Sequence, residues 1–190
     1  MQKDIVTIIF GDSIAYGLYD MEKFGWTNRI KEKITNNNFI FNLAIPGQNS
    51  IDILNKFELE LKNRYNDQDE FKIIFSFGTK DTLLLSKNNN HLKHFEENVL
   101  KIIDIANKYT SDISFIGLIK PDFNIRKEYN IDDVFKIDEL LENICKLKMI
   151  KHISLINIIK NDELVDGLHP NNIGHKKIFE LVLKELYKEK

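Results

Sequence analysis

The sequence predicts a three-layer α/β/α domain built on a five-stranded parallel sheet. Short runs rich in β-branched and aromatic residues alternate along the chain with longer amphipathic segments. This rhythm is typical of parallel strands joined by crossover helices. The composition agrees, since 43% of the 190 residues are hydrophobic, 29% are charged, and only 8 are Gly and 3 are Pro. These values indicate one compact domain over residues 1–190 rather than a disordered or fibrous chain.

Five apolar runs have the length and the residue types of buried strands. They are Ile5–Phe10, Phe39–Leu43, Lys72–Phe77, Ile113–Gly117 and Ile153–Leu155. Between and after them, apolar residues at helical spacing predict helices. These helices run from about Thr27 to Thr35, Ser50 to Arg64, His91 to Tyr109, Ile131 to Lys148 and Ile173 to Lys188. The Asn-rich stretches 36–38 and 88–90 favour turns, one before a strand and one before a helix.

Charge and cysteine content limit the classes of partner and substrate that the protein is expected to have. With 27 Lys and Arg against 29 Asp and Glu, the net charge is −2, so nothing in this balance indicates nucleic acid or an anionic membrane as a partner. Small neutral or weakly charged molecules are the expected substrates. Cys145 is the only cysteine, which excludes an internal disulfide and favours a buried apolar role. No apolar run approaches the roughly 20 residues of a membrane span or resembles a secretory signal, so we expect a cytoplasmic protein.

Reactive side chains follow the first and last predicted strands. Gly11-Asp12-Ser13 comes directly after the first strand, and Asp166-Gly-Leu-His169-Pro170 follows the fifth, just before the last helix. The carboxyl ends of parallel strands meet at one edge of the sheet, where open α/β sheets bind ligands. A hydroxyl, a carboxylate and an imidazole are the set that acyl transfer needs. Taken separately, Ser13 could cap a turn and Asp166 could belong to an ordinary Asp-Gly turn; both together favour catalysis.

With a third segment, Asn42-Leu-Ala-Ile-Pro-Gly47 after the second strand, these motifs resemble the SGNH-hydrolase group of the GDSL esterase and lipase family over essentially the whole chain. The resemblance implies a flavodoxin-like fold and a serine esterase of small-molecule esters, without a metal or an organic cofactor. It implies Ser13 as nucleophile, His169 as base and Asp166 as the acid that orients the base. The backbone N–H groups of Ser13 and Gly47 would bind the oxyanion in an acyl-enzyme mechanism.

One segment departs from the family pattern. Where the family has Gly-x-Asn-Asp, this sequence reads Gly78-Thr79-Lys80-Asp81, so a lysine replaces the asparagine that completes the oxyanion hole. Lys80 could supply a charge-assisted hydrogen bond to the oxyanion. It could instead turn away and pair with Asp12, Asp81 or solvent, leaving two backbone donors. It could also bind an anionic part of the substrate. The three alternatives stay open at this point.

Aromatic residues after Ser13 suggest where a substrate could lie. Four of them, together with the leucines that follow Lys80, are candidates for the walls of an acyl or alcohol pocket, with Asp12 beside the nucleophile. These residues are Tyr16, Tyr19, Phe24, Trp26 and Leu83 to Leu85. Packing of the aromatic side chains into the core is an equally good interpretation. If they do form a pocket, the short loops favour small acyl groups such as acetyl.

Two further interpretations of the function remain open. A binding or regulatory protein could keep the fold and have lost turnover through Lys80, and an acyltransferase could pass the acyl group to a sugar or another alcohol. The other histidines are expected to have no catalytic role. His91 and His94 should form the exposed start of a helix without a third metal ligand, His175 should lie on the surface of the last helix, and His152 should precede the fifth strand in a loop.

Overall fold

The computed structural model describes residues 3–34, 37–88 and 90–187 and confirms the predicted α/β fold. Five parallel strands form one sheet in the order β2-β1-β3-β4-β5. The strands are β1 (Ile5–Gly11), β2 (Asn38–Asn42), β3 (Glu70–Ser76), β4 (Ile113–Ile116) and β5 (Lys151–Ile153). The α-helices are α1 (Ser13–Tyr16), α2 (Trp26–Lys33), α3 (Ser50–Lys62), α4 (Thr79–Leu85), α5 (His91–Ala106), α6 (Ile131–Leu147) and α7 (Asn172–Leu186), and a 3₁₀ turn covers Asn161–Glu163.

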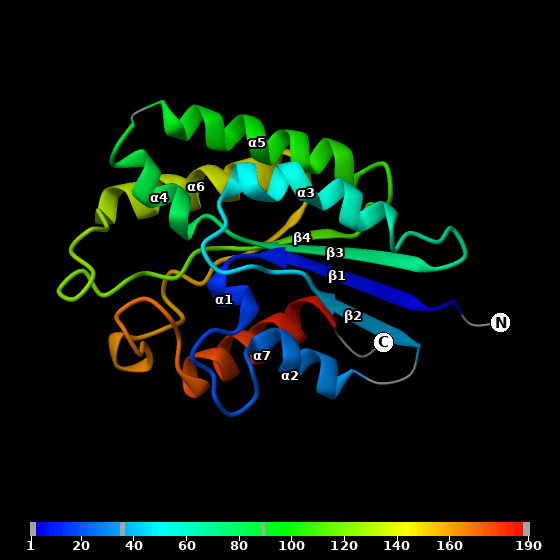
Figure 1. Cartoon of the computed structure of the whole chain (residues 1–190), viewed down its shortest axis with the longest axis horizontal. Coiled ribbons are helices and arrows are strands. Elements are labelled where there is room, and N and C mark those ends of the chain that lie inside the picture. Colours follow the sequence, from blue (N-terminus) through cyan, green and yellow to red (C-terminus); the bar gives the residue numbers. More distant parts are fainter. Residues whose placement is uncertain (1–2, 35–36, 89, 188–190) are drawn as a thin grey trace.

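Helices cover both faces of the sheet (Figure 1). Helices α3, α4, α5 and α6 lie on one face, and α1, α2 and α7 lie on the other. Each layer buries its own apolar cluster against the sheet, one around Phe57, Phe75 and Phe115 and the other around Trp26 and Ile178. Burial of apolar side chains on both faces is the dominant stabilising term in such a domain.

The alternation of side chains along β1 explains why both clusters form. Val6, Ile8 and Phe10 belong to the cluster under α3 and α5, whereas Ile9 belongs to the cluster under α2 and α7. Successive side chains of a strand point to opposite faces of the sheet. A strand that is buried on both faces therefore carries apolar side chains at consecutive positions. β1 is such a strand, because its side chains enter the apolar clusters on both faces of the sheet.

Asparagine side chains begin three of the long helices. Asn49, Asn130 and Asn171 lie at the N-caps of α3, α6 and α7, and each accepts a hydrogen bond from a backbone N–H of the first helical turn. At α3, Asp52 completes a capping box by accepting from the Asn49 N–H. Asparagine is among the best N-cap residues because its side-chain oxygen satisfies an otherwise unpaired N–H.

The structure departs from the sequence prediction in two short helices. No helix was predicted at the motifs that carry Ser13 and Lys80, but Ser13 begins α1 and Lys80 lies in the first turn of α4. With four and seven residues, α1 and α4 are too short for an apolar period to stand out.

The ends of the longer elements also shift. The fifth strand lies two residues earlier than predicted, because pairing with β4 selects Lys151–Ile153. Predicted residues Thr35, Asn36, Asn89 and Lys188 lie outside the described residues. None of the helices in the described ranges has the length and apolar character needed to cross a bilayer.

Three histidines lie in surroundings that the sequence did not predict. His175 was expected on the surface but is fully buried, and His152 is part of β5 rather than of a loop. His91 does begin a helix, but its side chain is only 12% exposed and contacts Asp81. Burial lowers the pKa of His175 to about 4, because the charged imidazolium loses its hydration there. Cys145 is buried as expected.

Candidate active site

The segment Gly11-Asp12-Ser13 makes a tight turn at the carboxyl end of β1. A Cβ atom on Gly11 would lie 2.4 Å from the carbonyl oxygen of Ser76 and 2.6 Å from Cβ of Ala15, so only glycine fits between β3 and α1. Asp12 is the N-cap of α1, and its carboxylate accepts a hydrogen bond from the Ile14 N–H at 3.0 Å. This turn fixes Ser13 as the first residue of α1 at the sheet edge.

The second half of the site comes from the segment between β5 and α7. Val165 N–H donates to the His169 carbonyl at 2.8 Å, and Leu164 and Pro170 form an antiparallel bridge, which closes a compact loop over residues 165–169. Asp122, in the segment after β4, donates its N–H to the Gly167 carbonyl at 2.7 Å. The loop is therefore held by its own backbone and by a neighbouring segment.

A continuous hydrogen-bonded chain joins these two segments. Ser13 Oγ lies 2.9 Å from Nε2 of His169, and Nδ1 of His169 lies 2.9 Å from Oδ2 of Asp166. The Asp166 carboxylate can accept a hydrogen bond from Nδ1 only if that nitrogen is protonated. In a neutral imidazole, Nε2 is then unprotonated and can accept the serine proton. The structure thus brings together Ser13, Asp166 and His169, which are separated by more than 150 positions at their extremes.

Hydrogen bonds keep Asp166 in its charged form. Burial alone would raise the pKa of Asp166. Three kinds of interaction outweigh burial and hold this pKa below its usual value: hydrogen bonds from the backbone N–H and imidazole of His169, the charge of His169, and a hydrogen bond from the Leu168 N–H. Its Oδ1 accepts the two backbone N–H groups at 2.9 and 3.1 Å. A carboxylate held in this way can orient the imidazole and stabilise its protonated form.

Asp12 has the opposite electrostatic character. Burial raises its pKa to about 6, although the Ile14 N–H, the Thr79 side chain and the charge of His169 favour the carboxylate. Asp12 was expected beside a substrate pocket. Its side chain is instead almost completely buried and binds the turn that carries Ser13, so it is not exposed to line a pocket.

The segment between β2 and α3 lies alongside the turn formed by Gly11, Asp12 and Ser13. Leu43 N–H donates to the Ile9 carbonyl at 2.8 Å, and Ile45 N–H donates to the Gly11 carbonyl at 3.1 Å. Gly47 has φ +80°, and a Cβ atom there would meet nothing within 4 Å, so its conformation rather than lack of space favours glycine. Within the described part of the chain, neither the Gly47 nor the Ser13 N–H donates a hydrogen bond. Both N–H groups are thus without a hydrogen-bond acceptor among the described residues.

Lys80 lies beside α3. Its ammonium is 3.8 Å from Oδ2 of Asp52, and its side chain is 45% exposed. Asp12 and Asp81, the carboxylates suggested as partners by the sequence, are buried and hydrogen-bonded elsewhere. Asp81 instead binds Ser50 and His91. Of the three alternatives, this geometry is nearest to a lysine that has turned toward another carboxylate.

The residues suggested for a pocket fall into two groups. Tyr16 and Phe24 are 52% and 69% exposed and, with part of α2 and β2, line a shallow groove next to α1. Trp26 is fully buried in the core beneath α2, so its assignment to a pocket wall is wrong. Leu83 packs half-buried against the other core cluster. The ring of Tyr19 lies 5.3 Å from that of His169 and shields one side of the imidazole.

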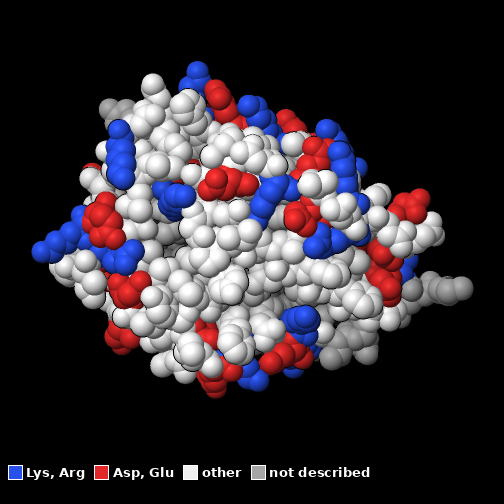
Figure 2. Space-filling model, in the orientation of Figure 1, with Lys and Arg blue, Asp and Glu red and all other residues white. Residues whose placement is uncertain are grey.

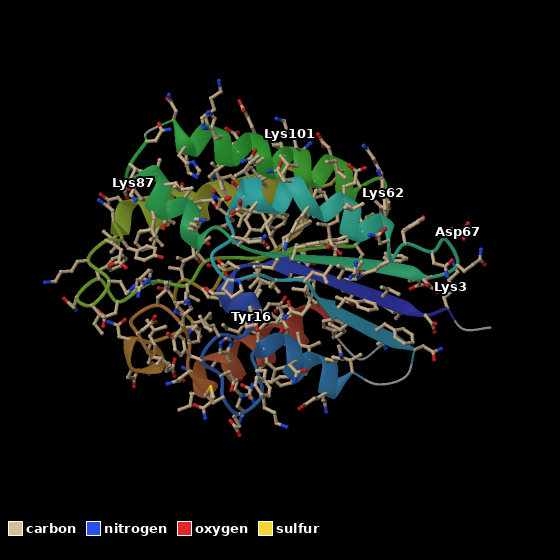
Figure 3. The ribbon with its side chains drawn as sticks, viewed as in Figure 1. Lys3, Tyr16, Lys62, Asp67, Lys87 and Lys101 are labelled. Carbon is tan, nitrogen blue, oxygen red and sulfur yellow. The ribbon has the colours of Figure 1, made fainter. Side chains whose placement is uncertain are left out.

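The surface around α1 carries few charges. Figure 2 shows that the centre of this face, over α1 and the adjoining end of β2, is largely uncharged, whereas Lys, Arg, Asp and Glu side chains surround it. Tyr16 lies near the middle of the same face (Figure 3). This surface suits a neutral ligand better than a highly charged one. Among the described residues, no group of three or more His, Cys, Asp or Glu side chains is placed to hold a metal ion.

Two residues near the site were not found from the sequence. Arg126, between β4 and α6, has Nη1 3.4 Å from Oδ2 of Asp166. His91 reaches the buried carboxylate of Asp81. Neither lies in a recognisable motif, because their contacts join segments that are 40 and 10 positions apart in the chain.

Comparison with solved structures identifies the class of the fold. A member of the lipolytic G-D-S-L family from Veillonella parvula superposes with a TM-score of 0.81 at 18% identity, covering 97% of this chain and 100% of that one. A lipase/acylhydrolase from Enterococcus faecalis gives 0.73 at 21% identity, with 95% and 94% covered. A catalytic mutant of an acetylxylan esterase from Geobacillus stearothermophilus gives 0.77 at 12% identity, with 100% and 97% covered. The chain has the fold of the SGNH hydrolases.

The sequence also matches a family model directly. The model of the GDSL-like Lipase/Acylhydrolase family covers residues 9–177, from β1 into α7. The chain therefore belongs to this family and is a hydrolase of the esterase type. A search of curated proteins gives no significant match.

Proposed function

We propose that the protein hydrolyses a small carboxylic ester through an acyl-enzyme on Ser13. The observation that carries the proposal is the hydrogen-bonded chain from Ser13 Oγ to His169 Nε2 and from His169 Nδ1 to Asp166, with both distances 2.9 Å. Nucleophile, base and orienting carboxylate lie in the geometry that proton transfer from the serine requires. A protein that only binds a ligand has no need for all three.

The reaction follows from the atoms in contact. His169 Nε2 removes the Ser13 proton as Oγ attacks the ester carbonyl, and Asp166 stabilises the imidazolium that forms. The imidazolium then protonates the leaving alcohol, which leaves the acyl group on Ser13. A water molecule, activated by the same imidazole, attacks the acyl carbonyl and releases the acid. Every proton passes through His169.

The oxyanion is proposed to be bound by the N–H groups of Ser13 and Gly47. Both are free of other hydrogen bonds within the described residues, and the Leu43 and Ile45 contacts hold the Gly47 segment against β1. Because Lys80 is directed to Asp52, it does not supply a third donor in this arrangement. Loss of one donor typically lowers turnover about 100- to 1,000-fold, so we expect a slow esterase.

The proposed substrate is an uncharged ester with a short acyl group. The surface around α1 is largely uncharged, and the groove bordered by Tyr16 and Phe24 is lined by neither Ser13 nor His169. Tyr19 also covers one side of His169. A long acyl chain would gain little burial there, whereas an acetyl group would need no further space.

The proposal is tested with p-nitrophenyl acetate. Initial rates of the wild-type protein and of Ser13→Ala are compared over a pH range after identical purification. We expect the wild-type rate to rise with pH across the range in which imidazoles titrate and the Ser13→Ala rate to fall to the buffer rate. Equal, negligible rates in both proteins would overturn hydrolysis of this ester and favour a protein that only binds. Faster turnover with an added alcohol would indicate acyl transfer.

A further inference from the structure

The carboxylate of Asp81 is completely buried between three helices of one layer. It belongs to α4 and accepts hydrogen bonds from the Ser50 N–H at 3.0 Å and the Ser50 hydroxyl at 2.7 Å, at the start of α3. Nε2 of His91, at the start of α5, lies 2.9 Å from the same carboxylate. Since a carboxylate only accepts, Nε2 must carry the proton of that bond. Helices α3, α4 and α5 occupy the same side of the sheet (Figure 1).

Ser50 connects this cluster to the proposed oxyanion donor. Gly47 lies three positions before Ser50, and the segment between them includes Asn49, the N-cap of α3. Two further contacts hold the same helix end. Asn98 of α5 donates to the Ser50 hydroxyl at 3.1 Å, and Lys80 lies 3.8 Å from Asp52. The segment is thus fixed at one end by β1 and at the other by Asp81.

We propose that His91 is a positioning residue for the Gly47 N–H. It acts through Asp81, whose carboxylate holds the backbone of Ser50, and this inference rests on the proposed function. A buried carboxylate that loses a hydrogen-bond donor either admits water or moves. Movement of Asp81 shifts the start of α3 and with it the Gly47 segment. An oxyanion donor acts mainly in the transition state, so a small displacement lowers kcat while substrate binding persists.

Two substitutions of His91, whose side chains carry the same amide group but differ in length, test this role. In His91→Gln the amide nitrogen can occupy the place of Nε2, whereas in His91→Asn the same group is too short to reach Asp81. We expect His91→Asn to lower kcat for p-nitrophenyl acetate about 10- to 100-fold with little change in KM, and His91→Gln to keep most of the activity. His94→Ala, an exposed histidine on the same helix, is the control and should match the wild type.

Amide hydrogen exchange supplies a readout independent of turnover. Exchange at Ser50 and in the segment 45–49 should increase in His91→Asn and return to the wild-type level in His91→Gln. Unchanged exchange and unchanged kcat in His91→Asn would overturn the inference while leaving the proposed function intact. If wild type shows no Ser13-dependent turnover, the proposed function fails, and unchanged exchange would still overturn the role of His91. Should His91→Asn not fold, Ser50→Ala removes the hydroxyl contact from the other side and is expected to give the same pattern.

Discussion

Arg126 and His169 share one carboxylate oxygen. Nη1 of Arg126 lies 3.4 Å from Oδ2 of Asp166, the atom that also lies 2.9 Å from Nδ1 of His169. Nε of Arg126 in turn lies 2.9 Å from a carboxylate oxygen of Glu128. In the proposed mechanism, a positive charge next to Asp166 opposes the formation of the imidazolium on His169.

The first prediction concerns this charge. In Arg126→Gln the guanidinium is lost, so the imidazolium that His169 forms in the proposed mechanism is opposed less and kcat/KM should rise, by about two- to fivefold. Glu128→Gln should lower kcat/KM by a similar factor. Steady-state kinetics with p-nitrophenyl acetate measure both changes. Arg64→Gln, which breaks a partly buried pair with Glu60 on α3, is the control, and an identical change in kcat/KM there would refute the local effect.

The second prediction concerns Lys80. Its ammonium is directed to Asp52, so Lys80→Ala should change kcat by less than about threefold, as expected for an exposed pair. Lys80→Asn places an amide where the family has its oxyanion donor and should raise kcat, by up to about 100-fold. Steady-state kinetics of the wild type, Lys80→Ala and Lys80→Asn measure both effects. A large loss of kcat in both variants would mean that the lysine is recruited to the oxyanion.

The third prediction concerns stability at acidic pH. His175 has a pKa of about 4 in the folded protein and about 6.5 when unfolded, so the unfolded chain binds more protons between these values. Its contribution to the free energy of unfolding therefore falls as the pH is lowered from 6.5 to 4, by at most about 1.4 kcal/mol per pH unit. Urea unfolding of wild type and His175→Gln over this range measures the effect, since Gln can still donate to the Leu18 carbonyl.

Asp12 acts against His175 in the same pH range. Its folded pKa of about 6 exceeds the usual 3.8, so its contribution to stability is present at low pH and is lost as the pH rises through these values. The difference between wild type and His175→Gln cancels this opposing effect. A pH slope that is the same in both proteins would show that His175 is not the responsible group.

The fourth prediction contrasts the effects of substituting Gly47 and Gly11. Gly47→Ala meets no neighbouring atom but forces alanine to φ +80°, so the loop should relax and kcat should fall about tenfold with a modest loss of stability. Gly11→Ala would place a Cβ atom 2.4 Å from the Ser76 carbonyl oxygen and should lower the free energy of unfolding by about 1–3 kcal/mol. Kinetics and urea unfolding of both variants measure the contrast. Equal effects on kcat and stability in the two would contradict it.

The strands and long helices could be predicted because their signals are local. The run from Ile5 to Phe10 is apolar on both faces, and Asn49, Asn130 and Asn171 stand where helices begin. The position of β5 could not be predicted, because pairing with β4 rather than the apolar residues themselves selects Lys151–Ile153. The burial of His175 escaped prediction, and for Trp26 the sequence left core packing and a pocket wall equally open. Each residue occupies the opening turn of a helix, where either burial or exposure is compatible with the sequence.

The sequence by itself determined the fold class and which motif residues stand at the ends of the strands, because side-chain period, turn residues and short motifs are properties of neighbouring positions. Only the tertiary structure decided which of these side chains meet. It joined Ser13 to His169 across 156 positions, directed Lys80 to Asp52, and set Arg126 and His91 against carboxylates. Such contacts depend on how the layers pack around the sheet. No local pattern records them, because their geometry is fixed by segments that are distant along the chain.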